Sequence, residues 1–149
     1  MKTVYEYNKA NLPTLVKNTN SAGSTIHSSF GYTYYADGNQ ASKTDKNGKV
    51  TSYTYNKFGR LVDENAPSFK YGYAYDVYGN RVAKTTTHKG YDYEWERYSY
   101  EYDANNRLTK ESYYDVYDTV YVSEYDYPYD KENISLKSNN ISWKYVIYI

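Results

Sequence analysis

Few residues of this chain have the types and spacing that enzyme chemistry requires. His27 and His88 are the only histidines, and His27 lies beside Ser28 and Ser29. Nothing in the sequence aligns these residues as a catalytic triad or places a serine on a nucleophile elbow. We therefore interpret both histidines as polar strand or loop residues.

Carboxylates are the other candidates for chemistry. Pairs spaced two apart share a strand face, and glycosidases use paired carboxylates. Such residues are Glu94, Glu96, Glu101 and Asp103. With 18 acidic residues in the chain, chance pairs are expected. No segment has the loop spacing of a calcium hand, and turn chemistry explains the Asp and Asn clusters. The sequence thus predicts no enzyme, no catalytic residue, no metal site and no cofactor.

Aromatic side chains offer a binding surface instead. The chain has 25 Tyr, against 3 Phe and 2 Trp. Exposed rings stack on sugars, and Trp95 is the residue that we single out as a candidate glycan contact. The simpler interpretation is that tyrosines stack on one another across strands. Both remain open at this stage.

Composition narrows the class of protein. The 18 basic and 18 acidic residues are interspersed, which disfavours a nucleic-acid partner because such binding needs clustered positive charge. No apolar run is long enough for membrane insertion. There is no cysteine, so disulfides are excluded. Leu and Ile are scarce, so we expect half-exposed tyrosines on both faces of a sheet rather than an aliphatic core.

A repeat accounts for most of the tyrosine. Its pattern is Tyr-x-Tyr-Asp/Asn-x-x-Gly/Asn, in six copies at residues 5–11, 32–38, 53–59, 73–79, 100–106 and 127–133. Tyr-x-Tyr places two rings on one face of a strand. The Asp or Asn accepts a hydrogen bond from the following backbone, and Tyr35 is the one exception at this position. The fourth turn residue must adopt a left-handed backbone, which Gly and Asn tolerate best.

These turns predict tandem hairpins. The expected left-handed positions are Asn11, Gly38, Gly59, Gly79, Asn106 and Asn133. Asn-Gly within residues 45–49 is the strongest cue for a turn at the opposite hairpin ends. Weaker turn signals lie at 20–24, 65–68, 87–90 and 114–118. We predict an all-β array over residues 1–149, with about a dozen antiparallel strands forming one continuous curved sheet.

The motif resembles the YD repeat of bacterial RHS proteins and animal teneurins, roughly Gly-x-Tyr-x-Tyr-Asp-x-x-Gly-Arg-Leu. Three copies carry the resemblance best. Their matching residues are Tyr53, Tyr55, Gly59, Arg60 and Leu61; Tyr73, Tyr75, Asp76, Gly79 and Arg81; and Tyr100, Tyr102, Asp103, Asn106, Arg107 and Leu108. The resemblance implies that these residues have a structural role.

The resemblance also implies a function. In the family, successive hairpins spiral into a hollow shell, which encloses a toxin or effector domain in bacteria and belongs to adhesion receptors in animals. We expect this chain to be a partial turn of such a shell, because about a dozen strands are too few to surround a domain. We also expect it to be a fragment of a longer protein, which fits the strand-like alternation at residues 143–149 that then stops. The resemblance implies a secreted or cell-surface location.

Two functional hypotheses follow. The first is a non-catalytic structural segment of an RHS shell, whose partner is an enclosed toxin or effector domain of the same polypeptide. The second is a module that binds carbohydrate or the cell surface through exposed Tyr and Trp. We also expect self-association through the open sheet edges at residues 2–8 and 143–149, because unpaired strand edges invite further strands.

Overall fold

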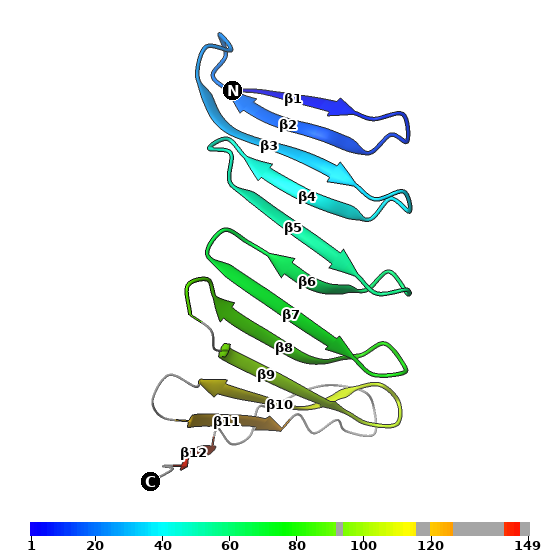
Figure 1. Cartoon of the computed structure of the whole chain (residues 1–149), viewed down its shortest axis with the longest axis vertical. Helices are drawn as coiled ribbons and strands as arrows, with labels where there is room; N and C mark the ends of the chain where they lie inside the picture. The colour runs from blue at the N-terminus through cyan, green and yellow to red at the C-terminus, as the bar shows by residue number, and fades with distance from the viewer. Residues whose placement is uncertain (92–93, 116–119, 127–141, 147–149) are drawn as a thin grey trace. The chain divides into compact units, whose positions relative to one another are not determined.

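The structure is a computed structural model that describes residues 1–91, 94–115, 120–126 and 142–146. The chain divides into two compact units, Met1–Pro67 and Ser68–Ile149. Each unit is a sheet of antiparallel strands that neighbour one another in chain order (Figure 1). Among the described residues, no helix is long and apolar enough to cross a membrane.

All elements of the described chain are strands joined by turns. The first unit contains β1 (Lys2–Tyr7), β2 (Pro13–Thr19), β3 (Ile26–Tyr34), β4 (Gln40–Asp45), β5 (Val50–Tyr55) and β6 (Leu61–Asn65). The second unit contains β7 (Phe69–Tyr75), β8 (Arg81–His88), β9 (Glu94–Tyr102), β10 (Leu108–Asp115), β11 (Val120–Asp126) and β12 (Ser142–Val146). The prediction of an all-β fold built from tandem antiparallel hairpins is confirmed.

The repeat motif closes alternate turns. Its first five copies join β1 to β2, β3 to β4, β5 to β6, β7 to β8 and β9 to β10, and every Tyr-x-Tyr pair ends the strand before the turn. The sixth copy, 127–133, lies outside the described residues. The turn signals at 20–24, 45–49 and 87–90 fall at or near strand ends, and 65–68 connects β6 to β7. Of segment 114–118, only the first two residues are described, and they end β10.

A β-bulge follows every described copy of the motif. Tyr55 pairs with Leu61 and Thr54 pairs with Asp63, so Val62 is the extra residue on the return strand. The same shift places Thr14, Ala41, Val82 and Thr109 as extra residues in the other four hairpins. A bulge increases the local twist of the strand pair. Each motif therefore closes a hairpin and also twists it in the same way.

The sheets have no buried apolar core. No hydrophobic side chain of the described residues is buried, and the buried residues are small hydroxyl side chains: Thr19, Thr51, Thr86 and Ser112. This agrees with the expectation that tyrosine replaces an aliphatic core. Stability must then come from backbone ladders, from stacked rings and from tyrosine hydroxyl bonds.

Candidate functional site

The motif turn has one geometry in all five described copies. In the third copy, the N–H of Asn56 donates to the carbonyl of Arg60, and the N–H of Gly59 donates back to the carbonyl of Asn56, both at 2.9 Å. Gly59 has a positive φ of 73°. The corresponding residues Asn11, Gly38, Gly79 and Asn106 also have positive φ. The predicted left-handed positions are therefore confirmed wherever the structure describes them.

The first turn residue caps the loop with its side chain. Asn56 Oδ1 accepts the N–H groups of Phe58 and Arg60 at 3.0 and 3.1 Å. Asn8, Asp76 and Asp103 accept the equivalent bonds in their turns. Asp45 does the same at the opposite end of the hairpins. No tyrosine pair precedes Asp45. The sequence signal that could have identified it as a loop-capping residue is its Asp-x-x-Gly spacing.

These bonds shift two carboxylates toward the ionised form. The N–H of Arg107 is the main reason that the pKa of Asp103 lies below its ordinary value; burial opposes it, and the Arg107 guanidinium, 2.6 Å away, adds to the lowering. Burial raises the pKa of Asp76, but hydrogen bonds from the side chain and backbone of Asn80 and from the following turn outweigh it. Both carboxylates thus stabilise the turns that they begin.

In the first unit, the second tyrosine of the second and third motif copies ties its hairpin to the preceding one. Tyr34 donates its hydroxyl hydrogen to the carbonyl of Pro13 at 2.7 Å, and Tyr55 donates to the carbonyl of Gln40 at 3.0 Å. Each acceptor is the strand partner of the preceding second tyrosine, since Pro13 pairs with Tyr7 and Gln40 pairs with Tyr34. A phenylalanine could not make this bond.

The second unit repeats the arrangement. Tyr102 donates its hydroxyl hydrogen to the carbonyl of Arg81 at 2.8 Å, and Arg81 pairs with Tyr75. The Arg81 guanidinium lies over the ring of Tyr100, 4.9 Å from its centroid, and 6.0 Å from that of Tyr73. Arg81, on the return strand, therefore packs against the first tyrosines of two motif copies, Tyr73 and Tyr100.

Other motif residues take part in ring contacts or in strand pairing. Arg60 lies over the ring of Phe58 at 5.3 Å. Leu61 and Leu108 pair with the second tyrosines Tyr55 and Tyr102 of their own hairpins. The first tyrosine Tyr53 pairs with Glu64 across the hairpin.

The candidate carboxylates do not converge on one site. Glu94 lies 3.9 Å from Arg97, and Glu101 lies 3.6 Å from Lys110. Glu96 accepts a hydrogen bond from the hydroxyl of Tyr113 at 3.4 Å. In the described part of the chain, His27 forms no side-chain hydrogen bond to Ser28 or Ser29; the hydroxyl of Ser28 accepts from Asn18 instead. Among the described residues, these groups therefore form separate pairs.

Trp95 lies in an aromatic cluster around His88. The His88 ring lies 4.9 Å from Phe69, 5.1 Å from Tyr91 and 5.4 Å from Trp95. The Nδ1 atom of His88 is buried and has no hydrogen-bond partner among the described residues. Tyr91 is 47% exposed, and Trp95 is half-buried. The cluster therefore presents part of its aromatic surface to solvent beside the predicted glycan contact.

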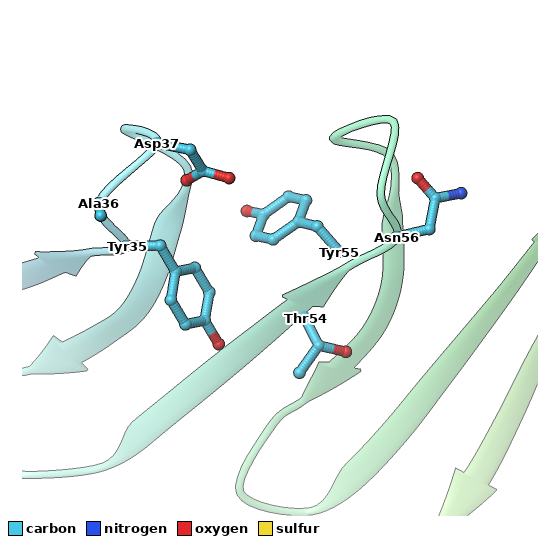
Figure 2. Close-up of a pocket in the computed structure, with 6 residues that line it drawn as sticks. All are labelled: Tyr35, Ala36, Asp37, Thr54, Tyr55 and Asn56. Atoms are coloured by element: carbon cyan, nitrogen blue, oxygen red, sulfur yellow. The ribbon is translucent and has the colours of Figure 1, made fainter.

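A pocket of about 500 Å³ lies in the first unit, between the second motif turn and the end of β5 (Figure 2). Its lining residues are Tyr35, Ala36, Asp37, Thr54, Tyr55 and Asn56. Tyr35 stands where the other described copies carry Asn or Asp. Its hydroxyl donates to the carbonyl of Tyr53 at 2.9 Å. Sequence reasoning marked Tyr35 as an exception but did not predict the pocket.

Known proteins show the same repeat and the same sheet. Residues 34–68 match the RHS Repeat family. This segment is therefore similar to an RHS repeat. The resemblance predicted from the tyrosine motif is therefore confirmed over that segment, which begins at Tyr34 and includes the third motif copy.

The fold of this chain is also found in solved structures. "Crystal Structure of TcdB2-TccC3-TEV" matches with a TM-score of 0.65 and 14% identity, over 88% of this chain and 7% of that chain. "Crystal Structure of TcdB2-TccC3 without hypervariable C-terminal region" matches with a TM-score of 0.57 and 14% identity, over 86% and 8%. This chain thus spans less than a tenth of either. No curated protein matches the sequence significantly.

Proposed function

We propose that the chain is a non-catalytic structural segment of an RHS-type shell, whose hairpins form part of a wall around a toxin or effector domain of the same polypeptide. The observation that carries the proposal is the second-tyrosine hydrogen bond. Tyr34 and Tyr55 each tie a hairpin to its predecessor within the first unit. A wall needs this property, because it must extend hairpin by hairpin without a core.

The described residues support a scaffold in two further ways. The motif carboxylates Asp76 and Asp103 are occupied by turn bonds. The fold likeness covers most of this chain and a small part of two long chains. We propose a secreted or cell-surface location on the basis of the family resemblance, and a single array over residues 1–149.

Limited proteolysis of the natural polypeptide that contains this segment tests the proposal. We expect an enclosed domain to resist digestion in the wild-type protein and to be cleaved faster in a Tyr34→Phe/Tyr55→Phe variant, because the wall is weakened. Tyr32→Phe is the matched control. Equal digestion of the enclosed domain in all three proteins would argue against a wall.

A second candidate function is carbohydrate binding through the Trp95 cluster. The exposed part of Tyr91 and the half-buried Trp95, whose centroids lie 6.1 Å apart, favour it, because sugar rings stack on aromatic faces. A glycan array tests it. Trp95→Ala should abolish any signal, whereas Tyr78→Ala, at a 77% exposed turn residue of β7–β8, should not. An array without hits would leave the shell as the sole function.

We also propose self-association through the β1 edge. Tyr7 is a second tyrosine, yet it is 55% exposed and its hydroxyl has no hydrogen-bond partner among the described residues. A strand from another copy could supply the carbonyl that Pro13 supplies to Tyr34. Sedimentation should show concentration-dependent dimers that Tyr7→Phe weakens. A monomer at every concentration would contradict this.

A further inference from the structure

Tyrosine rings of this protein commonly carry a cation from the same chain. Arg81 lies over Tyr100 at 4.9 Å, and Arg97 lies over Tyr114 at 4.7 Å. Lys84 lies between two rings, at 5.5 and 5.4 Å from their centroids. In such contacts, the positive charge of the side chain is attracted to the negative face of the aromatic ring. Several tyrosine rings of the described residues are therefore already covered by an arginine or lysine of the same chain.

The pocket of Figure 2 differs in this respect. Its two rings, Tyr35 and Tyr55, lie 6.2 Å apart and nearly perpendicular, at 88°. Among the described residues, no lysine or arginine lies over either ring. Two walls of a cation site are thus present, and the described residues supply no cation to it.

A carboxylate completes the arrangement. The Asp37 side chain extends toward the hydroxyl end of Tyr55 (Figure 2). Its oxygens accept the N–H and the side-chain amide of Asn39, at 3.0 and 2.9 Å. Among the described residues it forms no ion pair. Its negative charge at the pocket is therefore not neutralised by a neighbouring side chain.

The charged groups around Tyr55 also favour a cation in the pocket. Burial raises the pKa of Tyr55 most, and Tyr35, Asp37 and Glu64 raise it further. The carboxylates of Asp37 and Glu64 therefore contribute negative charge near the Tyr55 hydroxyl. This favours a cation in the pocket over an anion, because an anion would be repelled by the same carboxylates.

We propose that the pocket formed by Tyr35, Tyr55 and Asp37 binds a small organic molecule through an ammonium group. Aromatic rings with an adjacent carboxylate recognise alkylammonium ions by cation–π attraction and charge. The pocket volume of about 500 Å³ lies in the range of small-molecule sites. The site is contained in the first unit and does not depend on the shell function.

The substitution that creates the site is Tyr35 itself. The equivalent residue in the first and third turns is Asn8 or Asn56, which caps its own loop. Tyr35 gives up that cap, and its ring instead lies beside Tyr55. The variant Tyr35→Asn therefore removes one wall of the pocket while restoring a turn residue that this chain already uses twice.

The proposal can be tested by adding choline to the full chain and following the titration by NMR. The control ligand is 3,3-dimethylbutan-1-ol, which has the shape of choline without its charge. We expect choline to shift the ring signals of Tyr35 and Tyr55 and the uncharged alcohol to shift them far less. Butylammonium, which mimics a lysine side chain, shows whether a primary ammonium binds as well as a quaternary one.

Variants complete the test. Tyr35→Asn and Asp37→Asn should each weaken choline binding, by about two- to fivefold. Asn at position 37 keeps an oxygen that can accept the Asn39 N–H, so the fold is retained, as the dispersed amide spectrum should show. Glu6→Gln removes a charge on β1 and should change nothing. Equal binding of choline and its uncharged analogue, no binding of either, or unchanged binding by Tyr35→Asn would overturn the proposal.

Discussion

The hydroxyl group of Tyr34 donates a hydrogen bond to the backbone carbonyl of Pro13, 2.7 Å away, and so joins the second hairpin to the first. Replacing Tyr34 with Phe should lower the free energy of unfolding by about 0.5–1.5 kcal/mol, because the carbonyl loses its donor. Urea denaturation followed by circular dichroism measures the loss. Tyr32→Phe, on the same strand, is the control, since its hydroxyl has no partner among the described residues. Equal losses in the two variants would contradict the assigned role.

Alkaline pH should weaken the first unit. Burial raises the pKa of Tyr34 above the ordinary 10.0, with Tyr32 adding to it, and burial is also the main cause for Tyr55. The folded state therefore holds these protons more tightly than the unfolded state. This contribution to stability is fully present below the ordinary pKa and is lost as pH rises through the folded pKa. Urea midpoints at about pH 8 and about pH 11 should show the loss, and Tyr34→Phe/Tyr55→Phe should reduce it.

Acid should weaken the turn of Asp103. Its pKa lies below the ordinary value of 3.8, chiefly because of the Arg107 N–H. The contribution is therefore present above the ordinary pKa and is lost as pH falls through the folded pKa. Asp103→Asn should keep the turn and remove its acid dependence, as Asn56 does naturally. Asp103→Ala should destabilise the protein at neutral pH as well. Thermal melts across pH measure both, and identical melts for the two variants would refute the capping role.

The left-handed backbone of Asn11 makes a further prediction. Asn11 has a φ of 60° and is exposed. Asn11→Ala should cost about 1–2 kcal/mol, because a β-carbon without a compensating side-chain bond disfavours this conformation. Asn11→Gly should leave stability unchanged or improve it. Chemical denaturation of the pair isolates the backbone effect. If alanine and glycine are equally tolerated, the turn does not require this conformation.

Two glycines that precede Tyr-x-Tyr pairs should respond differently to alanine. A β-carbon on Gly72 would lie 2.7 Å from Thr85 Oγ1, whereas one on Gly31 would lie 3.9 Å from the nearest atom, the carbonyl oxygen of Thr14. Gly72→Ala should destabilise the second unit by about 1–3 kcal/mol through overpacking. Gly31→Ala is the matched control and should be tolerated. Thr85→Ala should rescue Gly72→Ala in a double-mutant cycle, and failure to rescue would place the clash elsewhere.

The hairpins were predictable because their turns are local. A positive φ at Gly59 and a cap at Asn56 depend on five consecutive residues, so their types suffice to predict the loop. The tyrosine pairs predicted strands for the same reason, since alternation along a strand needs no tertiary information.

The contacts between hairpins were not predictable in this way. The bond from Tyr55 to Gln40 depends on the register between β4 and β5, which belong to two successive hairpins. The ring of Tyr35 lies in the pocket because its turn packs beside β5, which no pattern within one repeat encodes. Trp95 was marked for its type alone. Its neighbour His88 comes from another strand, and so does Phe69, which contacts His88.

The lack of a buried apolar core has a consequence for how such a chain can evolve. Where hairpins bond only to their sequence neighbours, a whole hairpin can be duplicated or deleted in frame without leaving a cavity. Array length then becomes a quantity that selection can adjust in steps, while each added step brings its own turn, its own twist and its own tyrosine bond.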